Sequence, residues 1–131
     1  DKKGIREKVK FVSDLTSEEI AQLYAESTIA VSPSVYEGFG FPAGEAMSCG
    51  IPLVSTNGGS LPEVVGDAGI IVNHSDPLSL YQGIKELLND EEKRLVYGKM
   101  GRERVLDKFT WERAARELVD VYKEAIINAN N

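Results

Sequence analysis

The stretch PSVYEGFGFPAGEAMSCG, residues 33–50, decides the fold because it joins an apolar run to a helical segment through closely spaced glycines. The preceding residues 28–32 (TIAVS) are typical of a strand, and a helix is predicted over 42–49, beginning at a proline that suits the first helical position. Glycines let the backbone of such a loop approach a ligand without Cβ atoms in the way. Two carboxylates, Glu37 and Glu45, flank the loop.

Apolar runs and helical patterns alternate on both sides of this stretch. Strands are predicted at 9–12, 28–32, 51–56 and 69–73, with helices at 16–27, 42–49 and 61–65 between them. Strands separated by single helices imply right-handed βαβ units and a parallel sheet. The strands are almost wholly apolar, as expected when helices cover both faces. We therefore expect an α/β domain with a doubly wound parallel sheet.

The last third of the chain is expected to be a helical segment. One apolar stripe runs from Leu80 to Leu88, and a longer one follows Thr110, which is a predicted helix cap. Trp111 is expected to anchor this last helix in the core. Residues 91–106 indicate a weaker helix, interrupted by two glycines.

Length and composition exclude several classes of protein. The chain has 131 residues, enough for about one domain with its own core, and carries a net charge of −6. No Lys or Arg occurs between Lys10 and Lys85, which argues against nucleic-acid binding. One cysteine allows no internal disulfide, and no apolar run is long enough to span a membrane, so a cytoplasmic location is expected.

The remaining conspicuous residues favour structural roles. His74 lies in a turn before a helix and is expected at the surface or in a cap, and Cys49 is expected to pack in the core. No second histidine or spaced cysteine accompanies them, so no metal site is predicted.

Two interpretations of the glycine loop stay open from the residues alone. If the helix begins at Pro42, the amides of Ala43, Gly44 and Glu45 are unpaired and attract an anion such as phosphate. Alternatively, the loop is only a tight turn that needs glycine for positive φ. A dinucleotide site is rejected because the spacing is G-x-G-x-x-x-G, and because the next strand ends at residues 55–57 without an acid for the ribose.

The two carboxylates add to the interpretation of the loop as a phosphate-binding site. Glu45 in the first helical turn either complements the helix dipole or accepts hydrogen bonds from the hydroxyls of a ribose. Glu37 in the loop is either solvated or holds a sugar by its hydroxyls. Phosphate between two binders of hydroxyl groups describes a nucleotide-sugar.

The segment YEGFGFPAGEAMSCGIPLVSTNGGSLPEVVGDAGIIVNHSDP, residues 36–77, resembles the donor-binding signature of retaining glycosyltransferases of the GT-B fold, family 4 or group 1. That family has two glutamates separated by seven residues, which Glu37 and Glu45 match. The P-S before the loop, the E-A-x-x-x-G-x-P segment, and Gly58-Gly59 with the following Pro62-Glu63 also resemble the family. The similarity runs from about Phe11 to the end of the chain.

The resemblance implies a role for each matched position. Glu37 would contact the donor sugar and act in catalysis, and the backbones of Phe39 and Gly40 would line the same sugar. Phe41 and Ala43 would present amides to the diphosphate, and Glu45 would hold the ribose. Residues 12–14 fall near the expected base site, and the 58–59 turn is expected to be structural or to line the cleft. No metal and no cofactor are implied, since the nucleotide-diphosphate sugar is the substrate.

The departures from the family pattern concern what is missing. Family members place an Arg and a Lys upstream to neutralise the diphosphate, and they carry an N-terminal acceptor-binding domain; neither is found here. We therefore expect residues 1–131 to be an N-terminally incomplete C-terminal nucleotide-sugar-binding domain, inactive alone. Any peripheral membrane association would come through the missing domain. A sugar-nucleotide epimerase of related fold and a non-catalytic nucleotide-binding module remain the alternatives.

Overall fold

The computed structural model describes residues 3–129 and contains one parallel sheet with helices between its strands. The strands lie in the order β1-β2-β3, with β1 Ala30–Ser32, β2 Leu53–Thr56 and β3 Ile70–Val72. The helices of the described residues are η1 Arg6–Lys8 (a 3-10 helix), α1 Ser17–Ala25, α2 Phe41–Ser48, α3 Leu61–Val65, α4 Pro77–Asn89, α5 Glu91–Lys108 and α6 Trp111–Ala129. This arrangement confirms the predicted α/β class.

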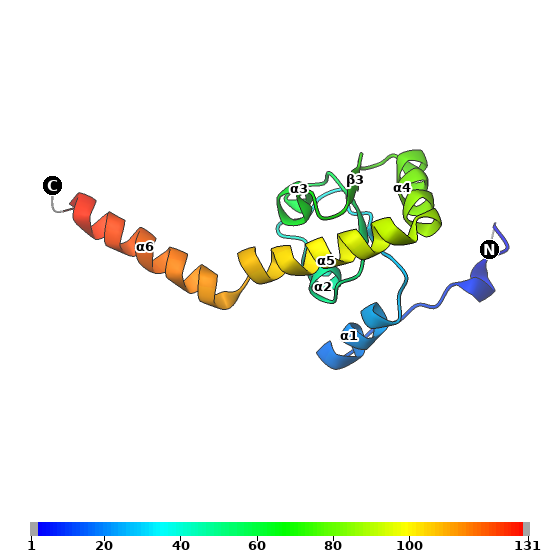
Figure 1. The fold of residues 1–131 in the computed structure, drawn as a ribbon, viewed down its shortest axis with the longest axis horizontal. Coiled ribbons are helices and arrows are strands. Elements are labelled where there is room, and N and C mark those ends of the chain that lie inside the picture. The colour runs from blue at the N-terminus through cyan, green and yellow to red at the C-terminus, as the bar shows by residue number, and fades with distance from the viewer. Residues whose placement is uncertain (1–2, 130–131) are drawn as a thin grey trace.

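Helices cover both faces of the sheet, as the apolar strands predict. In Figure 1, β3 lies between α3 and α4. On one side, Gly83 of α4 lies so close to the sheet that a Cβ there would be 3.0 Å from the side chain of Val54. On the other side, Met47 of α2 and Leu61 of α3 form a buried core with Leu53. All four residues of β2, the central strand, are buried.

Helix α5 is longer and more regular than its two glycines suggested. It packs along α2, and a Cβ at Gly98 would lie 2.3 Å from the carbonyl oxygen of Gly50. The second glycine, Gly101, faces Met47 at a distance that leaves little room for a side chain. The glycines therefore allow close helix packing rather than interrupting the helix.

The helix cap predicted at Thr110 is confirmed, and side chains cap other helices of the described residues as well. Thr16 and Glu19 form a capping box, in which the hydroxyl of Thr16 accepts from the amide of Glu19 at 3.2 Å and the carboxylate accepts from the amide of Thr16 at 2.8 Å. The carboxylate of Asp76 accepts from two amides in the first turn of α4, and Thr110 caps α6.

The predicted strand at 9–12 is wrong. These residues follow η1 in an irregular stretch, and the side chain of Phe11 is 91% exposed. An apolar run becomes a strand only where a neighbouring strand pairs with it. Within residues 3–129, β1 pairs only with β2, so this run has no partner.

The expectation that Trp111 anchors α6 in the core is also wrong. Figure 1 shows α6 extending away from the sheet beyond the end of α5. None of its described residues is buried, and Trp111 is 89% exposed. The helix is amphipathic as predicted, but its apolar side chains are open to solvent: Leu118, Val119, Val121, Tyr122, Ile126 and Ile127.

Candidate functional site

Glu37 lies in the loop that leaves the carboxyl end of β1, where ligands bind in open α/β sheets. Its side chain is half-buried, and its Oε1 accepts a hydrogen bond from the hydroxyl of Ser34 at 2.7 Å. Its backbone carbonyl accepts from both the amide and the hydroxyl of Ser60, each at 3.1 Å. The loop around Glu37 is therefore held at both its side chain and its backbone.

The turn after β2, at residues 58–59, packs directly against the loop that holds Glu37. A Cβ at Gly58 would lie 2.6 Å from the carbonyl oxygen of Ser34, and one at Gly59 would lie 2.3 Å from that of Glu37. Gly59 also has φ +62°, a conformation that side chains disfavour. Both glycines are thus required by backbone packing, which agrees with the structural role expected for them.

The first turn of α2 differs from the prediction. The helix begins at Phe41, so Pro42 is its second residue and Glu45 lies beyond the first turn. The amides of Ala43 and Gly44 donate to the carbonyl of Gly40 at 3.0 and 3.1 Å, so the expectation that they are unpaired is wrong. Gly40 caps the helix in a left-handed conformation, which turns its carbonyl into reach of those amides.

The residues that the resemblance assigned to the donor differ in exposure. Gly40 and Ala43 are buried, and Ala43 belongs to the core, so each can offer only its backbone. Phe41 is exposed, and its amide, unlike that of Ala43, is not hydrogen-bonded in the structure. The carboxylate of Glu45 is exposed on α2.

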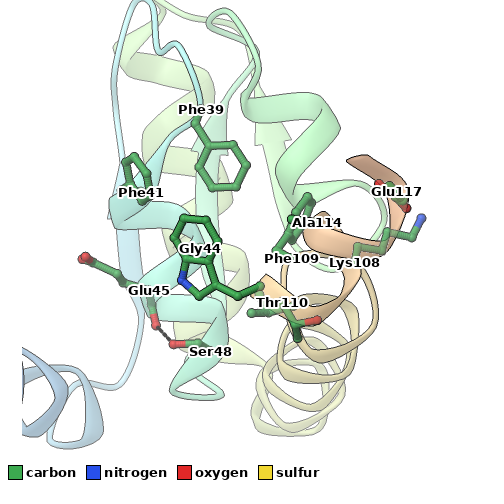
Figure 2. A pocket seen from close by; sticks show the side chains of 12 residues that line it. Phe39, Phe41, Gly44, Glu45, Ser48, Lys108, Phe109, Thr110, Ala114 and Glu117 are labelled. Atoms are coloured by element: carbon green, nitrogen blue, oxygen red, sulfur yellow. Dashed lines mark hydrogen bonds between the residues drawn. The ribbon is translucent and has the colours of Figure 1, made fainter. Parts of the chain in front are cut away.

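A pocket of about 430 Å³ opens beside α2, and Figure 2 shows its lining. Phe39 and Phe41 form one wall, facing Phe109 at the junction of α5 and α6. The rings of Phe39 and Phe109 meet edge to face at 5.5 Å. Glu45 lines this pocket, whereas Glu37 does not.

Charge around the pocket comes from distant parts of the chain. Lys108 and Glu117 lie on the wall opposite Glu45 (Figure 2). Lys108 lies beyond the long stretch of sequence without Lys or Arg and comes to this region through the fold. Two carboxylates still outnumber this one cation among the lining residues.

Tyr24 of α1 connects electrostatically to Glu45. Burial raises the pKa of Tyr24 above its usual value of 10.0, and the negative charges of Glu45 and Cys49 add to the effect. Its hydroxyl donates to the carbonyl of Pro42 at 3.2 Å. Glu45 is thus close enough to α1 for its charge to affect the ionisation of Tyr24.

Residues expected outside the site are placed as follows. His74 is exposed, and its amide donates to the side chain of Asn57, as suits a surface turn. Cys49 is half-buried and unpaired. Residues 12–14 are exposed and do not line the pocket. Across residues 3–129, no three His, Cys, Asp or Glu side chains gather as metal ligands, and none of the described helices is long and apolar enough to cross a membrane.

Comparison with known proteins identifies the family of this α/β fold. Residues 1–104 match the family described as glycosyl transferases group 1. The chain belongs to this family. A group 1 chain is expected to have the α/β fold observed here.

Two relatives of this group 1 chain are named mannosyltransferases. It is 38% identical to O-antigen chain mannosyltransferase B of Escherichia coli, over 92% of this chain and 32% of the relative. It is 40% identical to MMP alpha-(1->4)-mannosyltransferase of Mycolicibacterium hassiacum, over 94% of this chain and 31% of the relative. The chain thus spans about a third of the length of these relatives.

Solved structures show the same fold. The sucrose-phosphate synthase of Thermosynechococcus elongatus superposes with a TM-score of 0.86 at 32% identity, covering 97% of this chain and 32% of that one. The C-terminal domain of a group 1 glycosyl transferase from Francisella tularensis superposes with a TM-score of 0.68 at 30% identity, covering 79% of this chain and 53% of that one. The group 1 chain therefore has the fold of a GT-B C-terminal domain.

Three residues near the predicted site were missed from the sequence. Ser34 donates a hydrogen bond to the carboxylate of Glu37, and Ser60 donates to its backbone carbonyl. The charge of Glu45 contributes to the raised pKa of Tyr24. The spacing of Ser34 and Glu37, three residues apart, is a usable signal, since serine hydroxyls bond groups at that separation. The contacts of Ser60 and Tyr24 depend on the tertiary fold, and no local pattern marks them.

Proposed function

We propose that this chain is the donor-binding domain of a retaining glycosyltransferase, which moves a sugar from a nucleotide-diphosphate sugar to an acceptor hydroxyl. The observation that carries the proposal is the pair Glu37 and Glu45, separated by seven residues around a glycine loop, at the carboxyl edge of a group 1 fold. Such an edge is where open α/β sheets bind their ligands.

Each residue has a separate part in this proposal. The carboxylate of Glu37 contacts hydroxyls of the donor sugar, and the backbones of Phe39 and Gly40 line the same sugar. The free amide of Phe41 meets the diphosphate, and the exposed carboxylate of Glu45 holds the ribose. Ala43 contributes to the diphosphate site only if its amide leaves the carbonyl of Gly40.

No side-chain nucleophile is required in this mechanism. The leaving diphosphate helps to deprotonate the acceptor on the same face of the sugar, and the protein stabilises the departing charge electrostatically. The nucleotide-sugar is a substrate, and the proposal includes no cofactor. The acceptor is expected within polysaccharide or glycoconjugate synthesis, because one relative is named for the O-antigen chain.

We further propose that residues 1–131 form the C-terminal part of a longer protein whose N-terminal domain binds the acceptor. Two exposed apolar features support this, Phe11 and the apolar side of α6, and so does the polar backbone edge of β1 that pairs with no described strand. Exposed apolar surface of this extent marks a site of contact. The cytoplasm stays the expected location on the sequence grounds given above.

The test is to incubate the full-length protein with UDP-glucose and with GDP-mannose, with and without a mixture of candidate acceptors. The proposal expects release of the nucleoside diphosphate and a glycoside that keeps the anomeric configuration of the donor. The 131-residue chain is expected to transfer no sugar, because the acceptor cannot be positioned without its own domain. An isomerised nucleotide-sugar formed without acceptor would contradict transfer and identify an epimerase.

A further inference from the structure

We propose that Ser34 is a positioning residue that fixes the carboxylate of Glu37 for the donor sugar. This inference rests on the proposed function, in which Glu37 contacts that sugar. The hydroxyl of Ser34 donates to Oε1 of Glu37 at 2.7 Å, the short distance typical of a hydrogen bond to a charged acceptor. Among residues 3–129, no other side chain bonds to this carboxylate.

The two residues cannot easily move apart, because the next strand holds the backbone at each end of the turn. The carbonyl oxygen of Ser34 accepts a hydrogen bond from the buried hydroxyl of Thr56, at the end of β2. The carbonyl oxygen of Glu37 accepts from the amide and the hydroxyl of Ser60. Between them, the two glycines of the 58–59 turn lie in backbone contact with both residues. The turn is therefore a rigid support on which the Ser34 hydroxyl has a defined direction.

In this geometry the two oxygens of the Glu37 carboxylate have different roles. One oxygen of Glu37 is occupied by Ser34, and the other is left for ligand hydroxyls. A glutamate without such a bond samples many rotamers and loses that freedom when a ligand binds. Fixing the side chain beforehand removes this loss and holds the sugar in the orientation from which it reacts. Ser34 thus acts on the sugar through Glu37, without touching it.

A purely structural role for Ser34 makes a different prediction. If its hydroxyl only stabilises the loop, its removal affects the nucleotide and the sugar alike, and does so whether or not Glu37 is present. If it positions Glu37, the effect is confined to steps involving the sugar and vanishes once Glu37 is removed. A double-mutant cycle separates the two roles.

The experiment uses the full-length protein and two readouts. The first is the turnover number for release of UDP from UDP-glucose or GDP from GDP-mannose, whichever donor the wild type uses, and the second is the Kd of the matching nucleoside diphosphate. Ser34→Ala is expected to lower turnover by about tenfold or more, the range for one lost hydrogen bond to a charged group. The Kd is expected to stay within about twofold, since the bond is remote from the nucleotide. Ser34→Thr keeps a hydroxyl and is expected to restore turnover.

Matched variants complete the test. Ser79→Ala removes another half-buried serine hydroxyl, which bonds a backbone carbonyl at the start of α4, and is expected to leave both readouts unchanged. In a Glu37→Ala background, Ser34→Ala is expected to have no further effect. An equal loss in that background, failure of Ser34→Thr to rescue, or a parallel rise in the Kd would overturn the positioning role while leaving the proposed function standing. If Glu37→Ala itself leaves turnover unchanged, both the role of Glu37 and its positioning by Ser34 are wrong.

Discussion

The hydroxyl of Tyr24 donates a hydrogen bond to the carbonyl oxygen of Pro42 at 3.2 Å, and so ties α1 to the first turn of α2. The same phenol feels the carboxylate of Glu45, one turn further along α2. Helix α2 carries the residues that we assign to the nucleotide. The pKa of Tyr24 therefore reports on the position of one of them, Glu45. This contact can be tested without a ligand.

Glu45→Gln is expected to lower the pKa of Tyr24 toward 10.0, because it removes a negative charge that disfavours the phenolate. Burial, the larger cause, remains, so the pKa should stay above that value. Spectrophotometric pH titration measures it, with Tyr24→Phe identifying which of the five tyrosines contributes the shifted step. An unchanged titration in Glu45→Gln would show that Glu45 points away from α1.

The same shift predicts how stability depends on pH. The pKa of Tyr24 is higher in the folded protein than in the unfolded chain, so the folded state holds the proton more tightly. The stabilisation is present below the unfolded value near 10.0 and is lost as the pH rises through the folded value. Denaturant unfolding at pH values between 10.0 and the folded value should therefore show a steeper loss of stability in the wild type than in Tyr24→Phe.

Gly59→Ala is expected to destabilise the protein by about 2–4 kcal/mol, since the new Cβ would combine a disfavoured backbone conformation with a clash against the carbonyl of Glu37. Gly38→Ala is the matched control in the same region, because a Cβ there meets nothing within 4 Å. It should change the free energy of unfolding by no more than about 0.5 kcal/mol. Equal effects of the two substitutions, measured by urea unfolding, would contradict the packing of the two loops described above.

The 131-residue chain is expected to bind nucleoside diphosphates only in the millimolar range, about 4 kcal/mol. The amides of Ala43 and Gly44 are occupied, and Lys108, the single cation among the residues that line the pocket, is outnumbered there by Glu45 and Glu117. A longer chain that includes the expected upstream Arg and Lys should bind about tenfold more tightly or better, with a gain that shrinks as salt rises. Calorimetric titration of both chains at low and high salt measures this. Micromolar binding by the short chain would mean that its phosphate site is already complete.

Local patterns predicted the class of fold well because they report on burial. The apolar runs at β1, β2 and β3 and the helix cap at Thr110 were visible in the sequence, since each depends on neighbours a few residues away. The run at 9–12 misled because strand formation requires a partner that local sequence does not reveal.

Predictions about the site depended on distances between residues far apart in the sequence, which the periodic pattern of apolar residues does not reveal. The start of α2 was placed one residue late, and this error made two amides seem free that in fact bond to Gly40. Lys108 approaches the pocket only because α5 folds back along α2. The glutamate pair itself was found because a fixed spacing around glycines is a sequence property.

The most direct test of the account compares Glu45→Ala and Glu37→Ala in the full-length protein by donor kinetics. Glu45→Ala should raise the Michaelis constant for the nucleotide-sugar by the equivalent of about 1.5–3 kcal/mol, the range for hydrogen bonds to a charged group, with little change in turnover. Glu37→Ala should instead lower turnover, because it removes the contact that orients the reacting sugar. Donor kinetics within about twofold of the wild type for both variants, well below the loss of one such bond, would contradict the assignment of this pair to the donor.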